Sequence, residues 1–135
     1  MDNRAAVERV LLIALGGAIG TVLRYLTSGL AAKWLGVDFP YGTLIVNLVG
    51  SFLIGVIHQL GTESMVLPDD MRWFLTTGVM GGLTTYSAFS YETVRLMEAQ
   101  AWTEAWLNVV VTTVSCLALC FLGIAAGRLL LGLRG

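Results

Sequence analysis

Long apolar runs alternate with short polar connections along the chain, and this pattern predicts helices that cross a membrane. No Asp, Glu, Lys or Arg occurs from Phe39 to Thr62, from Trp73 to Tyr91 or from Ala105 to Gly127. A helix needs roughly 20 mostly apolar residues to cross the hydrocarbon core of a bilayer, and each run is long enough. A further apolar stretch near the start of the chain contains Arg24 close to one end.

Four membrane spans follow from this pattern. We expect them at about Val10–Leu30, Tyr41–Leu60, Arg72–Met97 and Ala105–Leu131. The first span also has the layout of a secretory signal, because Arg4 and Arg9 precede its apolar stretch. The helical pattern continues past Arg24 without a clear cleavage site, so we interpret it as a retained span. Residues 1–135 are therefore expected to form one all-α membrane domain.

Composition agrees with a membrane protein and argues against several soluble functions. Of the 135 residues, 56% are hydrophobic and 13% are charged, and the mean hydropathy is +0.78. Soluble domains carry about 25% charged residues. A net charge of −1 offers no basic surface for nucleic acid. Cys116 and Cys120 lack the spacing of a zinc site, and we interpret them as packing residues.

The distribution of Lys and Arg gives only a weak instruction for orientation in the membrane. Four spans place both chain ends on one side. That side holds Arg4, Arg9, Arg72, Arg128 and Arg134, and the other side holds Arg24, Lys33 and Arg95. Orientation follows the excess of Lys and Arg. A chain that inserts both ways can pair with an inverted copy, while a modest ordinary bias is the alternative that charge counting leaves open.

Small and polar residues within the predicted spans indicate a tight bundle with a polar stripe. Glycines four residues apart let helix backbones approach each other, as at Gly16 and Gly20, Gly78 and Gly82, and Gly123 and Gly127. Asn47 lies in the middle of the second span on one face with Thr43 and Ser51. Its amide has four hydrogen-bonding positions, so we expect this face to point inward. Ser and Thr can instead bond their own backbone one turn back.

The third span contains the sequence GGLTT, from Gly81 to Thr85, which predicts a break in the helix. Gly and β-branched Thr are poor helix formers. Backbone within a membrane unwinds only where it is buried in protein or lines a wet cavity. Unwound carbonyl groups favour cations, and the N–H groups that begin the next half-helix favour anions. The alternative is a kinked helix whose threonines bond back to carbonyl groups.

Three residues after the predicted break have side chains suited to an ion path. Tyr86 and Phe89 share a helical face, and the positive edges of their rings can meet an anion, although packing is the ordinary role of such a pair. Glu92 lies three residues before Arg95. This spacing fits either an exposed helical salt pair or a vestibule position near a polar path.

These segments resemble the two motifs of the Fluc (CrcB) family of fluoride channels. The motifs run from Gly42 to Ser51 and from Gly81 to Thr93, and the likeness covers essentially the whole chain. The resemblance implies four-helix subunits in the cell (inner) membrane, paired with membrane lipid around them as an antiparallel, dual-topology homodimer. Two pores per dimer would export fluoride passively and relieve its toxicity. A structural sodium ion at the dimer centre would bind the backbone carbonyls matching Gly81 and Thr84.

The resemblance also assigns side chains to the fluoride pathway. Asn47 corresponds to the pore asparagine of the family, and Phe89 to one member of the aromatic pair beside each pore. Tyr86 stands where the family commonly has Phe; its ring keeps an edge, and its hydroxyl adds a donor. The remaining residues on or near the family's polar path or vestibule are Thr43, Ser87, Glu92, Ser115 and Arg24.

Three other functions compete with a fluoride channel, and one of them, a fluoride/proton antiporter, needs a proton relay that we do not find in the sequence. A small proton-coupled multidrug exporter needs a titratable acid deep within a span, and the first span has none. A non-conducting accessory subunit explains the packing glycines, but it explains neither Asn47 nor the break in the third span. The sequence contains no nucleophile–base constellation, phosphate loop or cluster of metal-ligating side chains, so we expect no enzymatic activity.

Overall fold

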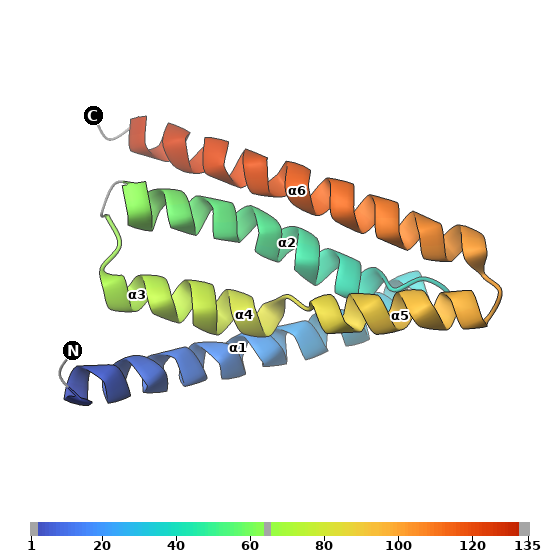
Figure 1. The fold of residues 1–135 in the computed structure, drawn as a ribbon, viewed down its shortest axis with the longest axis horizontal. Coiled ribbons are helices and arrows are strands. Elements are labelled where there is room, and N and C mark those ends of the chain that lie inside the picture. Colours follow the sequence, from blue (N-terminus) through green and yellow to red (C-terminus); the bar gives the residue numbers. More distant parts are fainter. Residues whose placement is uncertain (1–2, 64–65, 133–135) are drawn as a thin grey trace.

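The computed structural model describes residues 3–63 and 66–132, and the regular elements of this part of the chain are all helices (Figure 1). In chain order they are α1 (Asn3–Leu35), α2 (Tyr41–His58), η1 (Gln59–Glu63), α3 (Asp69–Trp73), η2 (Phe74–Met80), α4 (Gly81–Leu83), α5 (Tyr86–Glu98) and α6 (Trp102–Gly132). The beginning of α1 and the end of α6 lie at the same end of the bundle. The prediction of an all-α protein is confirmed.

Three helical segments are long and apolar enough to cross a membrane. They are Asn3–Leu35, Tyr41–Gly61 and Trp102–Gly132. In the first and last of these, only 11% of the residues in the most apolar 18-residue stretch are buried, so most of their nonpolar side chains face outward. The predicted third span is instead a series of short helices, from α3 to α5, that run in line with one another (Figure 1).

Glycines bring the helix backbones into direct contact. A Cβ atom on Gly16 of α1 would lie 2.6 Å from the carbonyl oxygen of Phe74, which is closer than atoms pack. A Cβ atom on Gly123 of α6 would overlap the carbonyl oxygen of Phe52 in α2. The predicted role of glycine pairs in close packing is therefore confirmed for α1 against the third segment and for α6 against α2.

Two stretches, η1 and η2, are π-helices, which the sequence did not predict. The wider turns of η2 face α1, where the Phe74 carbonyl lies against Gly16 and the Val79 carbonyl against Gly20. A π-helix changes which residues of a helix face a neighbour, and single π turns occur mostly inside longer α-helices. Here the change precedes the break in the same segment.

The predicted break in the third segment is confirmed at Thr84 and Thr85, between α4 and α5. Thr84 has φ −81° and ψ 156°, and Thr85 has φ −155° and ψ 113°, so both residues are extended. The Thr85 hydroxyl then caps α5 by accepting the N–H of Ala88 at 3.2 Å. The Thr84 hydroxyl donates back to the Met80 carbonyl at 2.9 Å. This bond, expected for a kinked helix, thus occurs beside a true interruption.

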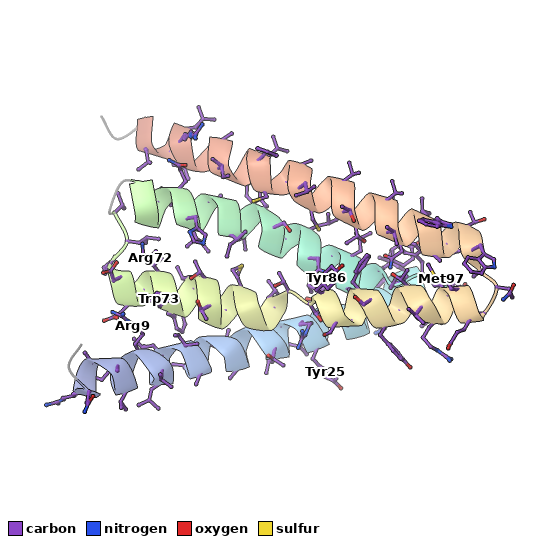
Figure 2. All side chains as sticks on the ribbon, viewed as in Figure 1. Arg9, Tyr25, Arg72, Trp73, Tyr86 and Met97 are labelled. Carbon is purple, nitrogen blue, oxygen red and sulfur yellow. The ribbon has the colours of Figure 1, made fainter. Side chains whose placement is uncertain are left out.

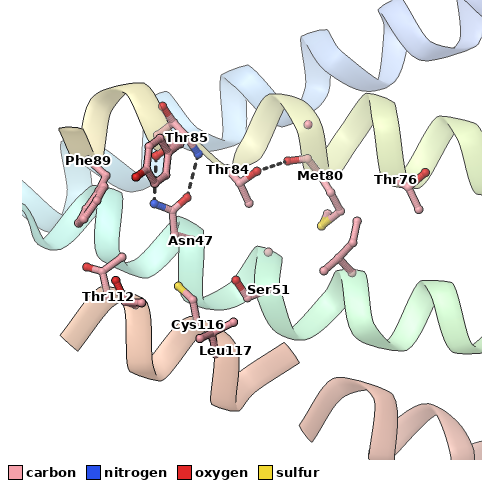
Figure 3. Close-up of a pocket in the computed structure, with 15 residues that line it drawn as sticks. Asn47, Ser51, Thr76, Met80, Thr84, Thr85, Phe89, Thr112, Cys116 and Leu117 are labelled. Carbon is pink, nitrogen blue, oxygen red and sulfur yellow. Dashed lines mark hydrogen bonds between the residues drawn. The ribbon is translucent and has the colours of Figure 1, made fainter. Parts of the chain in front are cut away.

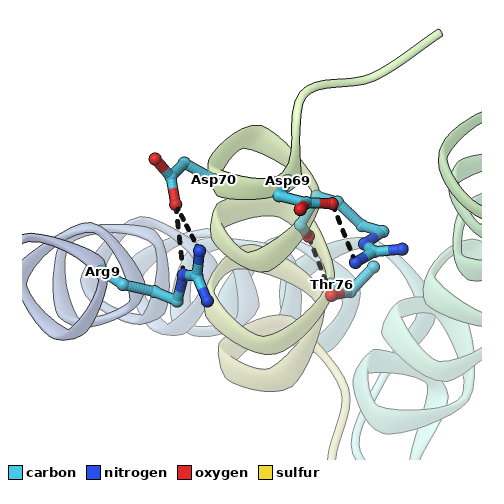
Figure 4. A network of polar contacts seen from close by, with 5 residues as sticks. Arg9, Asp69, Asp70 and Thr76 are labelled. Atoms are coloured by element: carbon cyan, nitrogen blue, oxygen red, sulfur yellow. Dashed lines mark hydrogen bonds and ion pairs between the residues drawn. The ribbon is translucent and has the colours of Figure 1, made fainter. Parts of the chain in front are cut away.

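One ion pair and one cation–π contact connect the start of the third segment to α1, at the end of the bundle where α1 begins (Figures 2 and 4). Arg9 contacts Asp70 at 3.1 Å and lies over the ring of Trp73, with 5.9 Å between its guanidinium carbon and the ring centroid. Arg72 contacts Asp69 at 3.1 Å. These groups are partly exposed, so they position α3 without adding much stability.

Candidate ion pathway

Asn47 binds the backbone of the break. Its Nδ2 donates to the Thr85 carbonyl at 3.1 Å, and its Oδ1 accepts the Thr85 N–H at 2.8 Å (Figure 3). In a continuous helix these groups would bond to backbone groups four residues away. The side-chain amide replaces the bond that the Thr85 N–H lacks and adds a donor to the Thr85 carbonyl, so the extended backbone is stable inside the bundle. The structure thus places Asn47 facing inward, as the sequence predicts.

A cavity of about 560 Å³ lies beside this amide, between α2, α6 and the broken segment (Figure 3). The residues that line it include Asn47, Thr85, Tyr86, Phe89, Thr112 and Cys116. The rings of Tyr86 and Phe89 lie 5.5 Å apart between centroids, so the two aromatic residues do share a face. Phe89 is buried, whereas 80% of Tyr86 is exposed. Of the two aromatic residues that line the cavity, Phe89 is therefore covered by the rest of the chain and Tyr86 is not.

A second cavity, of about 310 Å³, lies between α5 and the α1–α2 connection. Thr43 and Glu92 both line it, and the Thr43 hydroxyl donates to Glu92 Oε1 at 2.8 Å. Glu92 Oε2 is buried and has no hydrogen-bond partner within the described part of the chain. Arg95 pairs with Glu98 at 3.1 Å. Of the two roles considered for Glu92, the helical salt pair with Arg95 is therefore wrong, because each residue has a different partner.

Three further residues predicted to lie on the path occupy different surroundings. Arg24 extends from α1 to the break, where its Nη1 donates to the Thr84 carbonyl at 3.4 Å. The Ser87 hydroxyl lies 3.3 Å from that of Thr85, in the first turn of α5. Ser115 is half-buried on α6 and lines neither of these two cavities. The structure thus brings Arg24 and Ser87 to the break and leaves Ser115 apart from the cavities.

The break leaves the Gly81 carbonyl without its helical donor, while the Thr84 carbonyl accepts from Arg24 at 3.4 Å. The Thr85 N–H bonds to Asn47, so the Gly81 carbonyl lacks its usual helical donor four residues on. Gly81 is exposed and lines the larger cavity. Unwound carbonyls of this kind coordinate sodium in membrane proteins. Among the described residues there is no cluster of His, Cys, Asp or Glu that could hold a metal ion instead.

The sequence analysis did not single out Asn108, the polar residue with the least exposure in the described chain at 2%. Its Nδ2 donates to the Thr93 hydroxyl at 2.9 Å, and its Oδ1 accepts the Thr112 hydroxyl at 3.2 Å. The Thr93 hydroxyl donates to the Phe89 carbonyl at 2.7 Å. Asn108 lies one helical turn before Thr112, on the polar face continued by Cys116, and this periodicity was the available signal.

Comparison with known proteins points to one family. The profile of a family described as "CrcB-like protein, Camphor Resistance (CrcB)" matches residues 11–124. A Geobacter protein named fluoride-specific ion channel FluC is 46% identical over 124 residues, which cover 92% of this chain and 100% of that protein. Proteins of the same name from Sorangium cellulosum and Anaeromyxobacter dehalogenans are 45% and 47% identical, with 93% of this chain covered in each case. They are covered over 98% and 100% of their own lengths.

Proposed function

The chain belongs to the CrcB-like family, and we propose that it is a fluoride channel through which fluoride leaves the cell passively. It is a multi-pass membrane protein, and the family consists of ion channels rather than enzymes. The observation that carries the proposal is the Asn47 amide held against the broken third segment, at the wall of the larger cavity. This arrangement presents hydrogen-bond donors to an ion inside the bundle. The membrane is the cell (inner) membrane.

Fluoride is a small anion that accepts strong hydrogen bonds, so a pathway must replace the water that it loses. One N–H of the Asn47 amide bonds to Thr85, which leaves the second available for the ion. The first turn of α5 adds backbone N–H groups without helical partners, at the positive end of the helix dipole. The ring edges of Phe89 and Tyr86 carry partial positive charge toward the same cavity.

The remaining residues proposed for the pathway lie at the second cavity and at the break. Thr43 and Glu92 form a hydrogen-bonded pair at the second cavity, which we assign to a vestibule. Ser87 lies at the first turn of α5, and Arg24 places a positive charge beside the break. Ser115 remains a prediction of the resemblance, because it lines neither cavity. A larger halide would fit this path poorly and would form weaker hydrogen bonds.

We further propose that the channel is a homodimer of antiparallel subunits, each with four spans. The broken third segment, from α3 to α5, would cross the membrane in addition to the three long apolar helices. A single chain leaves Tyr86 largely exposed and the larger cavity open, and an inverted second copy would cover both. Each subunit would contribute one larger cavity, so the dimer would contain two pores. The Gly81 and Thr84 carbonyls of both subunits would hold a structural sodium ion at the centre.

Fluoride efflux from liposomes tests the proposal. Purified protein is reconstituted with potassium and valinomycin to clamp the potential, and chloride efflux is measured in parallel. We expect rapid, potential-driven fluoride efflux without chloride leakage. No fluoride efflux from a folded dimer, or equal efflux of chloride, would contradict a fluoride-selective channel. Proton-coupled loss of an organic cation from the same liposomes would favour an exporter instead.

A further inference from the structure

The position of α5 depends on side-chain hydrogen bonds. The extended residues Thr84 and Thr85 interrupt the helix before it, so no continuous backbone ladder aligns α5 with α4. Asn47 holds the start of α5 to α2 through Thr85. Two turns further along α5, Asn108 holds this helix to α6 through the hydroxyl of Thr93. The Asn108 bond therefore provides a second attachment for a helix that carries part of the proposed pathway.

The directions of the hydrogen bonds around Asn108 are fixed by chemistry. The Phe89 carbonyl can only accept, so the Thr93 hydroxyl donates to it and must accept from the Asn108 amide nitrogen. The amide oxygen then faces Thr112 and can only accept. The Thr112 hydroxyl must consequently donate to Asn108. The Thr112 hydroxyl proton is thus directed at Asn108, and the oxygen can present only its lone pairs to the larger cavity.

Burial makes this set of bonds costly to break. Asn108 is 2% exposed, Thr93 is 6% exposed and Thr112 is 7% exposed, so water cannot replace a lost partner. An unsatisfied buried donor or acceptor costs about 1–3 kcal/mol. The bonded geometry is thus strongly preferred over alternatives in which the Asn108 amide turns around.

We infer that Asn108 is a positioning residue for the fluoride pathway. Asn108 binds one residue of the larger cavity directly, because its amide oxygen accepts from Thr112. It is connected to a second, Phe89, through the hydroxyl of Thr93. Asn108 itself lines neither cavity. It sets the distance between the Phe89 ring on α5 and the Thr112 hydroxyl on α6, and it determines where the Thr112 proton points. This inference rests on the proposed function.

Thr93 offers a test that leaves the cavity walls unchanged, because it lines neither cavity. Thr93→Val keeps the shape of the side chain and removes the hydroxyl, and Thr93→Ser restores the hydroxyl as the matched control. Fluoride and chloride efflux are measured per folded dimer in liposomes, for these variants and for Asn108→Leu. We expect Thr93→Val and Asn108→Leu to lower fluoride efflux on the order of tenfold, a change equivalent to about 1.4 kcal/mol in the barrier. We also expect both variants to admit chloride.

A double variant separates positioning from general loss of stability. If Asn108 acts through Thr93, the double variant of Thr93→Val and Asn108→Leu passes fluoride no more slowly than Asn108→Leu alone. Thr93→Ser retains the efflux and chloride exclusion of the parent. Parent-like efflux and selectivity in folded Thr93→Val and Asn108→Leu would overturn the inference and leave the proposed function intact. Absence of fluoride efflux in the parent protein would overturn both.

Discussion

At the scale of single residues, Asn47 combines two tasks that are usually separate. Its amide satisfies both polar groups of the Thr85 backbone, at 3.1 Å and 2.8 Å. The same side chain lines the larger cavity. A substitution therefore changes the stability of the break together with the proposed donor to the ion, and an experiment must measure both.

Asn47→Leu removes both hydrogen bonds to Thr85 and the donor to the cavity. We expect a loss of about 1–3 kcal/mol in stability, because the Thr85 N–H loses its acceptor and becomes unsatisfied. Thermal unfolding in detergent measures this loss, and liposome efflux measures a fall in fluoride conduction. Asn47→Asp is the matched variant: its carboxylate still accepts the Thr85 N–H, but it repels an anion and donates nothing. Rapid fluoride efflux through folded Asn47→Asp would contradict the pore role.

Tyr86 allows the ring and the hydroxyl to be tested separately. Tyr86→Phe keeps the ring beside Phe89, and the hydroxyl is on a residue 80% exposed, so the stability of the single subunit should not change. Tyr86→Leu removes the ring edge together with the aromatic pair with Phe89, a pair worth about 0.5–1.5 kcal/mol, and it should slow fluoride efflux by up to about tenfold. Efflux assays on both variants check this. Equal efflux in Tyr86→Leu and the parent would remove the aromatic edge from the pathway.

At the scale of elements, the contact between α2 and α6 depends on the absence of side chains. Gly55 of α2 faces the Cys120 carbonyl, and Gly123 of α6 faces the Phe52 carbonyl. In a bilayer, lipid tails are as apolar as the helices, so packing and close backbone approach drive association. These glycines therefore set the separation of the two walls between which the cavity lies.

Gly123→Ala should separate α6 from α2, since the added Cβ would overlap the Phe52 carbonyl oxygen. Overpacking of this kind costs about 1–3 kcal/mol. Gly29→Ala is the control, because a Cβ at Gly29 meets no atom within 4 Å. Thermal unfolding of both variants in detergent measures the difference. Equal stability of Gly123→Ala and Gly29→Ala would mean that the backbone contact is looser than the structure has it.

The break and the position of the second span were predictable from sequence because local chemistry determines them. The run from Gly81 to Thr85 opposes helix formation wherever it occurs, and the absence of charge from Phe39 to Thr62 requires an apolar environment. The first helix runs from Asn3 to Leu35 and is longer than the predicted span, Val10–Leu30, because the helix continues beyond the apolar stretch at both ends. One local contribution is the ion pair of Arg4 and Glu8 at 3.2 Å.

Features that depend on a distant partner were not predictable. The hydroxyl that binds Glu92 belongs to Thr43, and the nearest charged residue in sequence, Arg95, pairs with Glu98 instead. Asn108 shares a face of α6 with Thr112, but its other partner, Thr93, is on the preceding helix. The π-helices likewise depend on how η2 meets α1. Only the packing of the helices reveals such pairs.

At the scale of the whole molecule, the single subunit has a small buried core. The hydrophobic residues buried in the described part are Ala31, Val46, Ile57, Met80, Leu83, Phe89 and Ala105. Many large apolar side chains are exposed on the single chain, as expected where lipid, and in the proposed dimer a second copy, replaces water. The proposed sodium ion would join two such subunits at their breaks, so its removal should act on the dimer rather than on either subunit.

Replacement of sodium by N-methylglucamine should lower the thermal stability of the dimer. A ligand present at 100 times its dissociation constant stabilises the bound state by about 2.7 kcal/mol. Unfolding and dissociation are monitored in detergent across a sodium titration, with potassium as the control cation. Identical unfolding temperatures in sodium and N-methylglucamine would argue against a sodium ion bound at the carbonyls of Gly81 and Thr84.

Dual topology predicts that a given loop lies on one side of the membrane in half of the chains and on the other side in the rest. A single cysteine at Ala99, in the exposed turn between α5 and α6, is introduced into a chain carrying Cys116→Ser and Cys120→Ser. An impermeant maleimide should label about half of the chains from each side of sealed vesicles, given the weak Lys and Arg bias. Labelling from one side alone would exclude an inverted pair in the membrane.

The small core also determines which positions natural variation can change. An outward side chain such as Leu129 needs only to remain apolar, because lipid imposes no specific shape on it. Gly123 and Asn108 have no such freedom, since one touches backbone and the other satisfies buried partners. A scan of all substitutions, selected by growth in fluoride, should therefore show tolerance at most large hydrophobic positions. Intolerance should concentrate at glycine and at the few buried polar side chains, the reverse of the pattern in a soluble domain.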